Sequence, residues 1–228
     1  MRSTFCQPYD EEFARRCILN CFPEFEWKLL LNKQDPPDII DEEALIGIEV
    51  VRAEDGKDAE FFNTYAQYHG KPKSDVPETL TNKFEKNGAK FFCNPDGIVF
   101  GAGCFGSEMF KNIQRCITKK TENLNKPSYN KFGVDALFIY NSGRFCFEND
   151  LQMIARGDCF PDHQQRKFQL IFIYSDHEVY LCNVINNTVM TRRLQDDDIS
   201  RLQKESLYEI DRNNEFQERR DFLYRRKK

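Results

Sequence analysis

The sequence predicts a mixed α/β fold, and three kinds of pattern indicate it. Apolar residues recur at helical spacing in residues 10–21 and again in residues 107–125. Residues 46–51 alternate in the way expected of a strand with two different faces. Short apolar runs bounded by turn residues, at residues 134–140, 168–174 and 179–185, indicate further strands.

The first elements are a helix, a strand and a β-hairpin. The helix runs from about Asp10 to Cys21, and residues 26–31 follow as a strand. Pro37-Asp38-Ile39-Ile40 and Ile46-Gly47-Ile48-Glu49-Val50-Val51 are predicted to be the two strands of the hairpin, with Asp41-Glu42-Glu43 as its polar loop. Each of these strands therefore carries one carboxylate.

The predicted hairpin brings Asp38 and Glu49 together. Side chains alternate along a strand, so Glu49 shares a face with Gly47 and Val51, while the isoleucines at 46 and 48 and Val50 share the other. The small Gly47 leaves room beside Glu49 for a ligand or another backbone. Two carboxylates plus phosphate oxygens are enough to bind Mg²⁺, which usually keeps several waters. Such an ion could activate a water toward a phosphodiester.

The middle of the chain is predicted to be a helical insertion followed by a short hairpin. The helices lie near residues 57–68 and 77–87. Strands at residues 90–93 and 98–100 then flank Asn94-Pro95-Asp96-Gly97, which is a strong turn signal. This second Pro-Asp pair is therefore interpreted as turn chemistry and not as a second metal site.

The helix at residues 107–125 presents an apolar stripe to the sheet, formed by Phe110, Ile113, Ile117 and Leu124. Gln114 and Lys120 flank this stripe, one on each side, whereas Lys119 falls opposite it and should be solvated. After a predicted turn at residues 175–178, the chain becomes mostly charged from residue 195 onward, with apolar residues spaced for one or two amphipathic helices. We expect one domain over residues 1–194, with its insertion at about 57–87, and a helical extension over 195–228.

Pro37-Asp38 and the Gly-Ile-Glu-Val strand around Glu49 resemble the PD-(D/E)xK (restriction-endonuclease-like) nuclease superfamily, and within it small uncharacterised bacterial proteins. The resemblance covers roughly residues 9–140 and rests on short motifs. It implies an αβββαβ core, Asp38 and Glu49 as metal ligands, and a lysine two residues after the Glu that positions the attacking water.

This sequence departs from the superfamily at that lysine, because Val51 occupies the position. Lys120 is the candidate for a displaced lysine; the alternative is that it only lays its aliphatic stem along the helix edge. Gln114 is a further candidate on the same helix. The resemblance also implies a Glu on the first helix, for which Glu12 is the candidate, although a charge in a helix's first turn is the commoner role of such a residue.

Composition limits the functional classes. The chain has 228 residues, 40% of them hydrophobic, and a net charge of −4, which does not favour coating DNA through a global field. Local basic clusters, such as Lys71-Pro72-Lys73, could line a groove or could simply be solvated. Trp27 and the many Phe residues fall in predicted strands and are interpreted as core. No long apolar run or signal-peptide pattern is present, so we expect a cytosolic protein.

The nine cysteines are interpreted as reduced thiols, since their number is odd and no Cys-x-x-Cys pair occurs. Cys17 and Cys21 lie one helical turn apart but have no second ligand pair. Cys159 and His163 could form a hydrolase pair or half a metal site, although Pro161 between them indicates an ordinary loop.

The sequence thus predicts a nuclease that uses Mg²⁺ or Mn²⁺ and acts on nucleic acid, with DNA as the expected substrate. The candidate site residues are Asp38, Glu49, Lys120, Glu12 and Gln114. The main alternative is a nuclease-like protein that binds nucleic acid or regulates without cleaving, which Val51 favours; a Cys159/His163 hydrolase is a third. The sequence is compatible with a homodimer and indicates no membrane partner.

Overall fold

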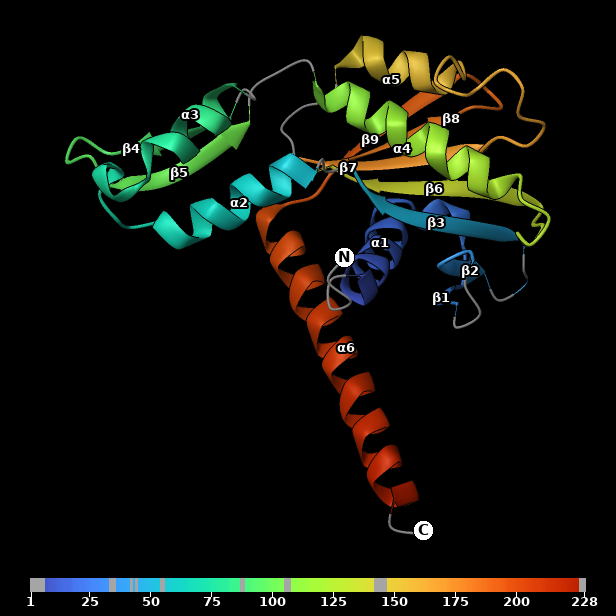
Figure 1. The fold of residues 1–228 in the computed structure, drawn as a ribbon. Coiled ribbons are helices and arrows are strands. Elements are labelled where there is room, and N and C mark those ends of the chain that lie inside the picture. The colour runs from blue at the N-terminus through green and yellow to red at the C-terminus, as the bar shows by residue number, and fades with distance from the viewer. Residues whose placement is uncertain are drawn as a thin grey trace. The chain divides into compact units, whose positions relative to one another are not determined.

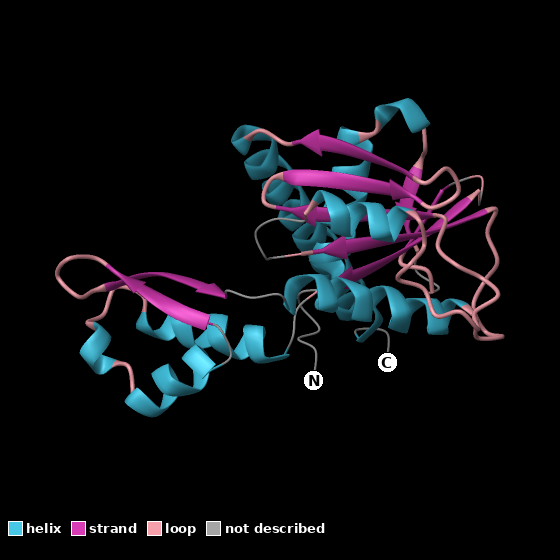
Figure 2. Ribbon diagram, turned by 90° about the horizontal axis from the view of Figure 1, so that it is seen from above, coloured by secondary structure: helices cyan, strands magenta, loops and turns pink. Residues whose placement is uncertain are grey.

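The computed structural model describes residues 7–32, 36–41, 43, 45–53, 56–86, 89–104, 108–141 and 147–225 (Figure 1). The chain forms two compact units: Met1–Arg52 together with Cys116–Lys228, and Ala53–Arg115. The second unit extends beyond the predicted insertion at residues 57–87, because it also includes a β-hairpin and the first half of a helix. Figure 2 distinguishes the helices from the strands in both units.

The first unit is built on a seven-stranded mixed sheet, which agrees with the predicted α/β class. The strand order is β1-β2-β3-β6-β7-β8-β9. Neighbouring strands are antiparallel except β3, β6 and β7, which run parallel to one another. The strands are β1 (Leu29–Leu31), β2 (Ile39–Asp41), β3 (Ile46–Arg52), β6 (Val134–Tyr140), β7 (Leu170–Ser175), β8 (Glu178–Asn183) and β9 (Thr188–Arg193).

Helices cover both faces of this sheet (Figure 1). On one face lies α1 (Gln7–Cys21), alongside which α6 (Asp196–Arg225) packs. The other face carries the C-terminal half of α4 (Glu108–Leu124) and α5 (Glu148–Ala155). The charged C-terminal segment is a single long helix, and three aspartates in its first turn complement the positive end of the helix dipole.

Strand β3 is buried on both faces, and this explains its composition. Ile46, Ile48 and Val50 pack into the main core with Phe13 of α1, as the alternation predicts. Val51, on the opposite face, is also buried. A strand between two helical layers needs apolar groups on both sides, so a buried charge on either face requires a partner.

Two elements of the first unit, α5 and β9, have no counterpart in the sequence prediction. The helix has only eight residues. Strand β9 is an edge strand, and most of its side chains are exposed and polar. Polar side chains suit an edge because they discourage pairing with another chain, but they remove the alternation by which a strand is recognised.

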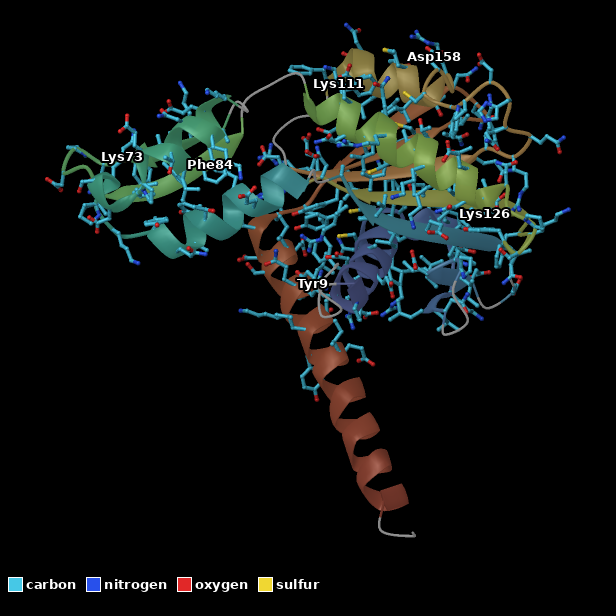
Figure 3. The ribbon with its side chains drawn as sticks, in the orientation of Figure 1. Tyr9, Lys73, Phe84, Lys111, Lys126 and Asp158 are labelled. Atoms are coloured by element: carbon cyan, nitrogen blue, oxygen red, sulfur yellow. The ribbon has the colours of Figure 1, made fainter. Side chains whose placement is uncertain are left out.

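The second unit consists of two helices and a β-hairpin. Phe61 of α2 (Gly56–Tyr68) and Phe84 of α3 (Glu78–Lys86) pack together with Ala89 of β4 (Ala89–Cys93), and Figure 3 labels Phe84 inside this unit. Strand β5 (Val99–Cys104) pairs antiparallel with β4.

The turn predicted at residues 94–97 joins these strands. The side chain of Asn94 accepts a hydrogen bond from the Ile98 N–H at 2.8 Å, and Gly97 has a φ of +76°, a conformation that glycine adopts without a steric cost. The second Pro-Asp pair is therefore part of a turn.

The prediction that the Phe residues are core is wrong for three of those that the structure describes. Phe92 and Phe100 of the β4–β5 hairpin are 38% and 57% exposed, and Phe147, just before α5, is 71% exposed. A two-stranded sheet covered by helices on one side leaves its other side open, so a strand's composition alone does not show which of its aromatic residues are buried.

Six of the cysteines that the structure describes form no disulfide: Cys17, Cys21, Cys93, Cys116, Cys159 and Cys182. Cys17, Cys21, Cys159 and Cys182 are buried, and burial raises the pKa of Cys17 well above its usual value. The Cys146 position lies outside the described residues. Within the described ranges, none of the helices combines the length and apolar character that crossing a membrane requires.

Gly47 provides a test of how the sheet packs. A Cβ at this position would lie 2.6 Å from the Phe132 ring, so the space expected for a ligand or backbone is filled by an aromatic side chain. We predict that Gly47→Ala lowers the free energy of unfolding by about 1–3 kcal/mol, because the ring must move. Urea denaturation measures the loss. In a Phe132→Ala background the same change should cost much less, and an equal cost in both backgrounds would contradict this account.

Candidate active site

Asp38 and Glu49 lie opposite each other at the start of β2. Ile39 pairs with Ile48 across the hairpin, so the preceding Asp38 faces Glu49. Both carboxylates are buried, at 5% and 4% exposure. Asp38 Oδ2 accepts a hydrogen bond of 2.6 Å from the Val50 N–H, so the aspartate side chain continues the hydrogen-bonded ladder where the backbone of β2 no longer does.

Lys120 reaches this pair from α4. Its Nζ donates a hydrogen bond to Glu49 Oε2, and the two form an ion pair. Both side chains are largely buried. The ammonium thus contacts a carboxylate and does not extend along the helix edge into solvent. Lys119, the residue before Lys120 on the same helix, is exposed, as the apolar stripe of the helix predicts.

The electrostatic balance of the site is visible in Asp38. Burial, together with the negative charge of Glu49, raises the pKa of Asp38 to about 7. The Val50 N–H and the Lys120 ammonium act in the opposite direction, but they do not cancel the first two effects. Above about pH 7, where Asp38 is ionised, the two carboxylates carry more negative charge than Lys120 alone offsets, and a bound cation would favour this ionised state.

Tyr129 is a member of the site that sequence reasoning missed. Its hydroxyl hydrogen-bonds to Glu49, and burial and the Glu49 charge raise the pKa of Tyr129 far above its usual value. The phenol therefore stays neutral and can donate to Glu49 at any ordinary pH. Residues 125–131 follow the end of α4 in an irregular segment, so no periodicity or motif signals the role of this tyrosine.

Arg166 holds the segment that carries Tyr129. Its guanidinium lies 5.5 Å from the centre of the Tyr129 ring and donates to both carboxylate oxygens of Asp135 at 2.9 Å. It also donates to the carbonyl of Leu124, the last residue of α4, at 3.0 Å. One side chain thereby links the end of the helix bearing Lys120, the Tyr129 segment and β6.

Glu12 has a different environment from the one that the resemblance implies. Its carboxylate pairs with Arg15 at 2.7 Å and with Arg16 at 2.6 Å. Burial opposes its charge, but the hydrogen bonds from both arginines keep the pKa of Glu12 below its usual value. The neighbouring Glu11 is the α1 carboxylate whose charge acts on Asp38. The spacing of apolar residues along a helix does not show which of two adjacent glutamates lies nearer to Asp38.

Gln114 lies six residues before Lys120 on α4, and it is half-buried. It belongs to the second unit, because α4 passes from one unit to the other between Arg115 and Cys116. At the other predicted site, Cys159 is buried whereas His163 is exposed. The two side chains therefore lie in different environments, which does not favour the hydrolase pair.

The donor set suits a hard cation bound partly through its substrate. Among the described residues, no cluster of three or more His, Cys, Asp and Glu side chains could hold a metal ion. Mg²⁺ is usually held by one or two carboxylates together with waters and phosphate oxygens, and Asp38 and Glu49 fit this mode. They do not form a cage that would hold a structural ion by itself.

The raised pKa of Asp38 predicts a stability effect with a defined pH dependence. The folded protein keeps this carboxyl protonated up to about pH 7, whereas the unfolded chain releases the proton near the ordinary pKa of an aspartate, 3.8. The free energy of unfolding should therefore fall between about pH 4 and pH 7, with the full loss present above pH 7. Asp38→Asn, which can still accept from Val50, should be more stable than wild type at pH 8 by on the order of 2 kcal/mol.

Urea denaturation at pH 8 and at pH 4.5 measures this difference, which should nearly vanish at the lower pH. The exposed Asp162 provides the control, since Asp162→Asn should leave stability nearly unchanged at both pH values. An Asp38→Asn protein less stable than wild type at pH 8 would contradict the electrostatic account.

Comparison of the chain with protein-family models, with curated proteins and with solved structures found no match. The function must therefore be argued from the geometry and chemistry of Asp38, Glu49, Lys120 and Tyr129.

Proposed function

We propose that the protein is a divalent-metal-dependent nuclease related to the PD-(D/E)xK superfamily. The observation that carries this proposal is the contact between Lys120 and Glu49, beside Asp38. These are the three charged groups that the superfamily motif requires. The lysine comes from a position 71 residues away in the sequence, yet its ammonium lies on the motif glutamate.

The order of the elements also supports the proposal. Around the second unit, the chain runs α1, β1, β2, β3, α4, β6. This is the αβββαβ order that the resemblance implies, with Asp38 immediately before the second strand and Glu49 within the third. The parallel pairing of β3 with β6 places the helix between them on the Glu49 face, and this is how a helical lysine can reach a strand glutamate.

In the proposed reaction, water attacks the phosphorus of a phosphodiester and the bond to one ester oxygen breaks. Asp38 and Glu49 would hold Mg²⁺ or Mn²⁺, which would supply positive charge to the phosphate and lower the pKa of a bound water. Lys120 donates hydrogen bonds and positive charge beside these ligands, where they can orient the water and stabilise the developing negative charge. The neutral Tyr129 fixes the Glu49 carboxylate. DNA is the proposed substrate.

One observation favours a second candidate function, a nuclease-like protein that binds nucleic acid without cleaving it. Val51 stands where the motif lysine would be, and it is buried opposite Ile139 of β6. No cation can come from that position. The two functions therefore differ in whether Lys120 replaces the missing lysine, and a cleavage assay separates them.

We predict that the purified protein nicks plasmid DNA with Mg²⁺ or Mn²⁺ and not with EDTA. Lys120→Ala should lower the rate by a factor that corresponds to about 2–4 kcal/mol, because a positioned cation near the transition-state charge is lost. Lys120→Gln, which keeps a donor but no charge, should be nearly as impaired. Circular dichroism must show that both variants are folded, since Glu49 loses its partner.

Lys119→Ala is the matched control, because it removes the same charge from the exposed side of the same helix. Its rate should equal that of wild type. Cleavage that is lost with Asp38→Ala but kept with Lys120→Ala would reject this lysine and keep the nuclease. A wild-type protein that cleaves no DNA or RNA would favour the binding protein.

Tyr129→Phe tests the support of the metal ligand. This variant keeps the ring beside Arg166 but removes the hydroxyl that holds Glu49. We predict that calorimetric titration shows Mn²⁺ binding weakened by about 10- to 100-fold, as is typical when the hydrogen-bond partner of a ligand is removed. Tyr180→Phe is the control, since it breaks a Tyr–Glu hydrogen bond, to Glu178, on β8. Equal affinities in the two variants would show that Tyr129 does not position Glu49.

A further inference from the structure

The β4–β5 hairpin presents aromatic rings to solvent. Phe91 points inward and packs on Phe61 and Phe84, with ring centroids 5.0 and 6.0 Å away. Phe92, the next residue, therefore faces the other side of the strand. Phe92 pairs with Gly101 of β5, and Phe100 is the residue before Gly101. The register of the two strands shifts here, so Phe100 has no partner of its own in the pairing. The two exposed rings thus come from neighbouring positions of one hairpin.

Glycines face Phe92 and Lys90 across the hairpin. Phe92 pairs with Gly101 and Lys90 pairs with Gly103, so two alternate positions of the facing strand, on the side of Phe92, carry no side chain. A Cβ added to Gly101 would lie 3.3 Å from the Phe92 ring. The Phe92 ring therefore lies over the Gly101 backbone, as a large side chain can where the facing residue is a glycine, and it remains 38% exposed.

Positive charge borders this surface. Residues 70–73 run along the free edge of β5, with the Val99 N–H donating to Lys71 O at 2.9 Å and the Lys73 N–H to Gly97 O at 2.8 Å. Lys71, Lys73 and Lys90 are all exposed, and Figure 3 labels Lys73. In residues 70–73 and 89–101, these three lysines are accompanied by one acidic residue, Asp96, at the tip of the turn.

We propose that this hairpin face, defined by Phe92, Phe100, Lys71, Lys73 and Lys90, binds a single-stranded nucleic acid. Unpaired bases stack on the exposed rings, and the lysines contact the phosphates. The choice of nucleic acid as ligand rests on the proposed function.

The chemistry of the face favours this ligand over a protein or a duplex. Aromatic rings bordered by cations are the usual means of binding single strands, because every base has a π face. Lysine is depleted in the cores of protein–protein interfaces, so three exposed lysines around two rings suit phosphate better than another protein. In a duplex, the base faces are already stacked on one another and do not reach a protruding ring.

The test is binding of a fluorescein-labelled 20-residue oligothymidylate, followed by fluorescence anisotropy with the full chain. EDTA is present, so that no metal-dependent cleavage occurs. Phe92→Ala and Phe100→Ala should each weaken binding by about 5- to 100-fold, the range for loss of one base–aromatic stack. Lys71→Glu/Lys73→Glu should weaken it further and lower the slope of log affinity against log salt by about 0.7 for each lysine that contacts a phosphate.

Two matched controls separate this face from general surface effects. Phe147→Ala removes an aromatic residue that is 71% exposed in the first unit, and Lys86→Glu reverses an exposed charge on α3. Both should bind the oligonucleotide nearly as wild type does. A duplex of the same length should bind more weakly than the single strand.

Three results would overturn the inference: no binding by wild type, unchanged binding by both Phe variants, or self-association in ultracentrifugation that the Phe variants abolish. The last result would identify the face as a contact between two copies of the chain. Because binding is measured without metal, it is independent of cleavage. Stacking-dependent binding without any nicking would uphold this inference and reject the nuclease, whereas nicking with unchanged Phe variants would do the reverse.

Discussion

The buried ion pair between Lys120 and Glu49 is the interaction on which the rest of the site depends. Burying either charge alone would cost several kcal/mol, and a pair offsets this cost only when its geometry and further hydrogen bonds are good. Glu49 has such support, since it also hydrogen-bonds to Tyr129. The pair connects α4 to β3. The Val50 N–H and the Lys120 charge favour an ionised Asp38, but the pKa of Asp38 is still raised to about 7, so the two carboxylates carry excess negative charge beside Lys120 only above that pH.

This arrangement is poor for stability and suitable for chemistry. A core built only for stability would replace two opposed buried carboxylates by apolar groups, because like charges destabilise each other. The residues around Tyr129 are also buried polar groups that hydrogen-bond to one another. Arg166 donates to Asp135 and to the carbonyl at the end of α4, and it stacks beside Tyr129. Polar groups that are buried, mutually bonded and directed toward one carboxylate pair are typical of a functional site held in position.

Local patterns could predict the hairpin, the helices and the residues nearest the motif, whereas long-range contacts could not be predicted. Alternation predicted that Asp38 and Glu49 lie side by side, and the structure has Asp38 opposite Glu49, although immediately before β2 and not within it. The apolar stripe of α4 separated Lys120 from Lys119, as the structure has them. Tyr129 and Arg166 lie in irregular segments without periodicity. Glu11 and Glu12 differ by about 100° around the axis of α1, and one apolar stripe does not fix which of them is directed toward Asp38. The exposure of Phe92 and Phe100 depends on which side the helices cover, and this is a property of the assembled unit.

The ammonium group beside Glu49 can come from a strand or from a helix, and here it comes from the helix α4. Val51 shares the face of Glu49, but it lies directly across from Ile139 in the middle of the sheet, under a helix. A lysine there would have to extend its charge through a packed apolar layer, which is costly. The helix that covers this face supplies the charge at no such cost, because the Lys120 stem descends from α4 to Glu49 and its ammonium meets the carboxylate from the helix side. Val51 and Lys120 are therefore two parts of one arrangement: the apolar Val51 packs between the sheet and the helix, and Lys120 supplies from the helix the charge that the buried Glu49 needs.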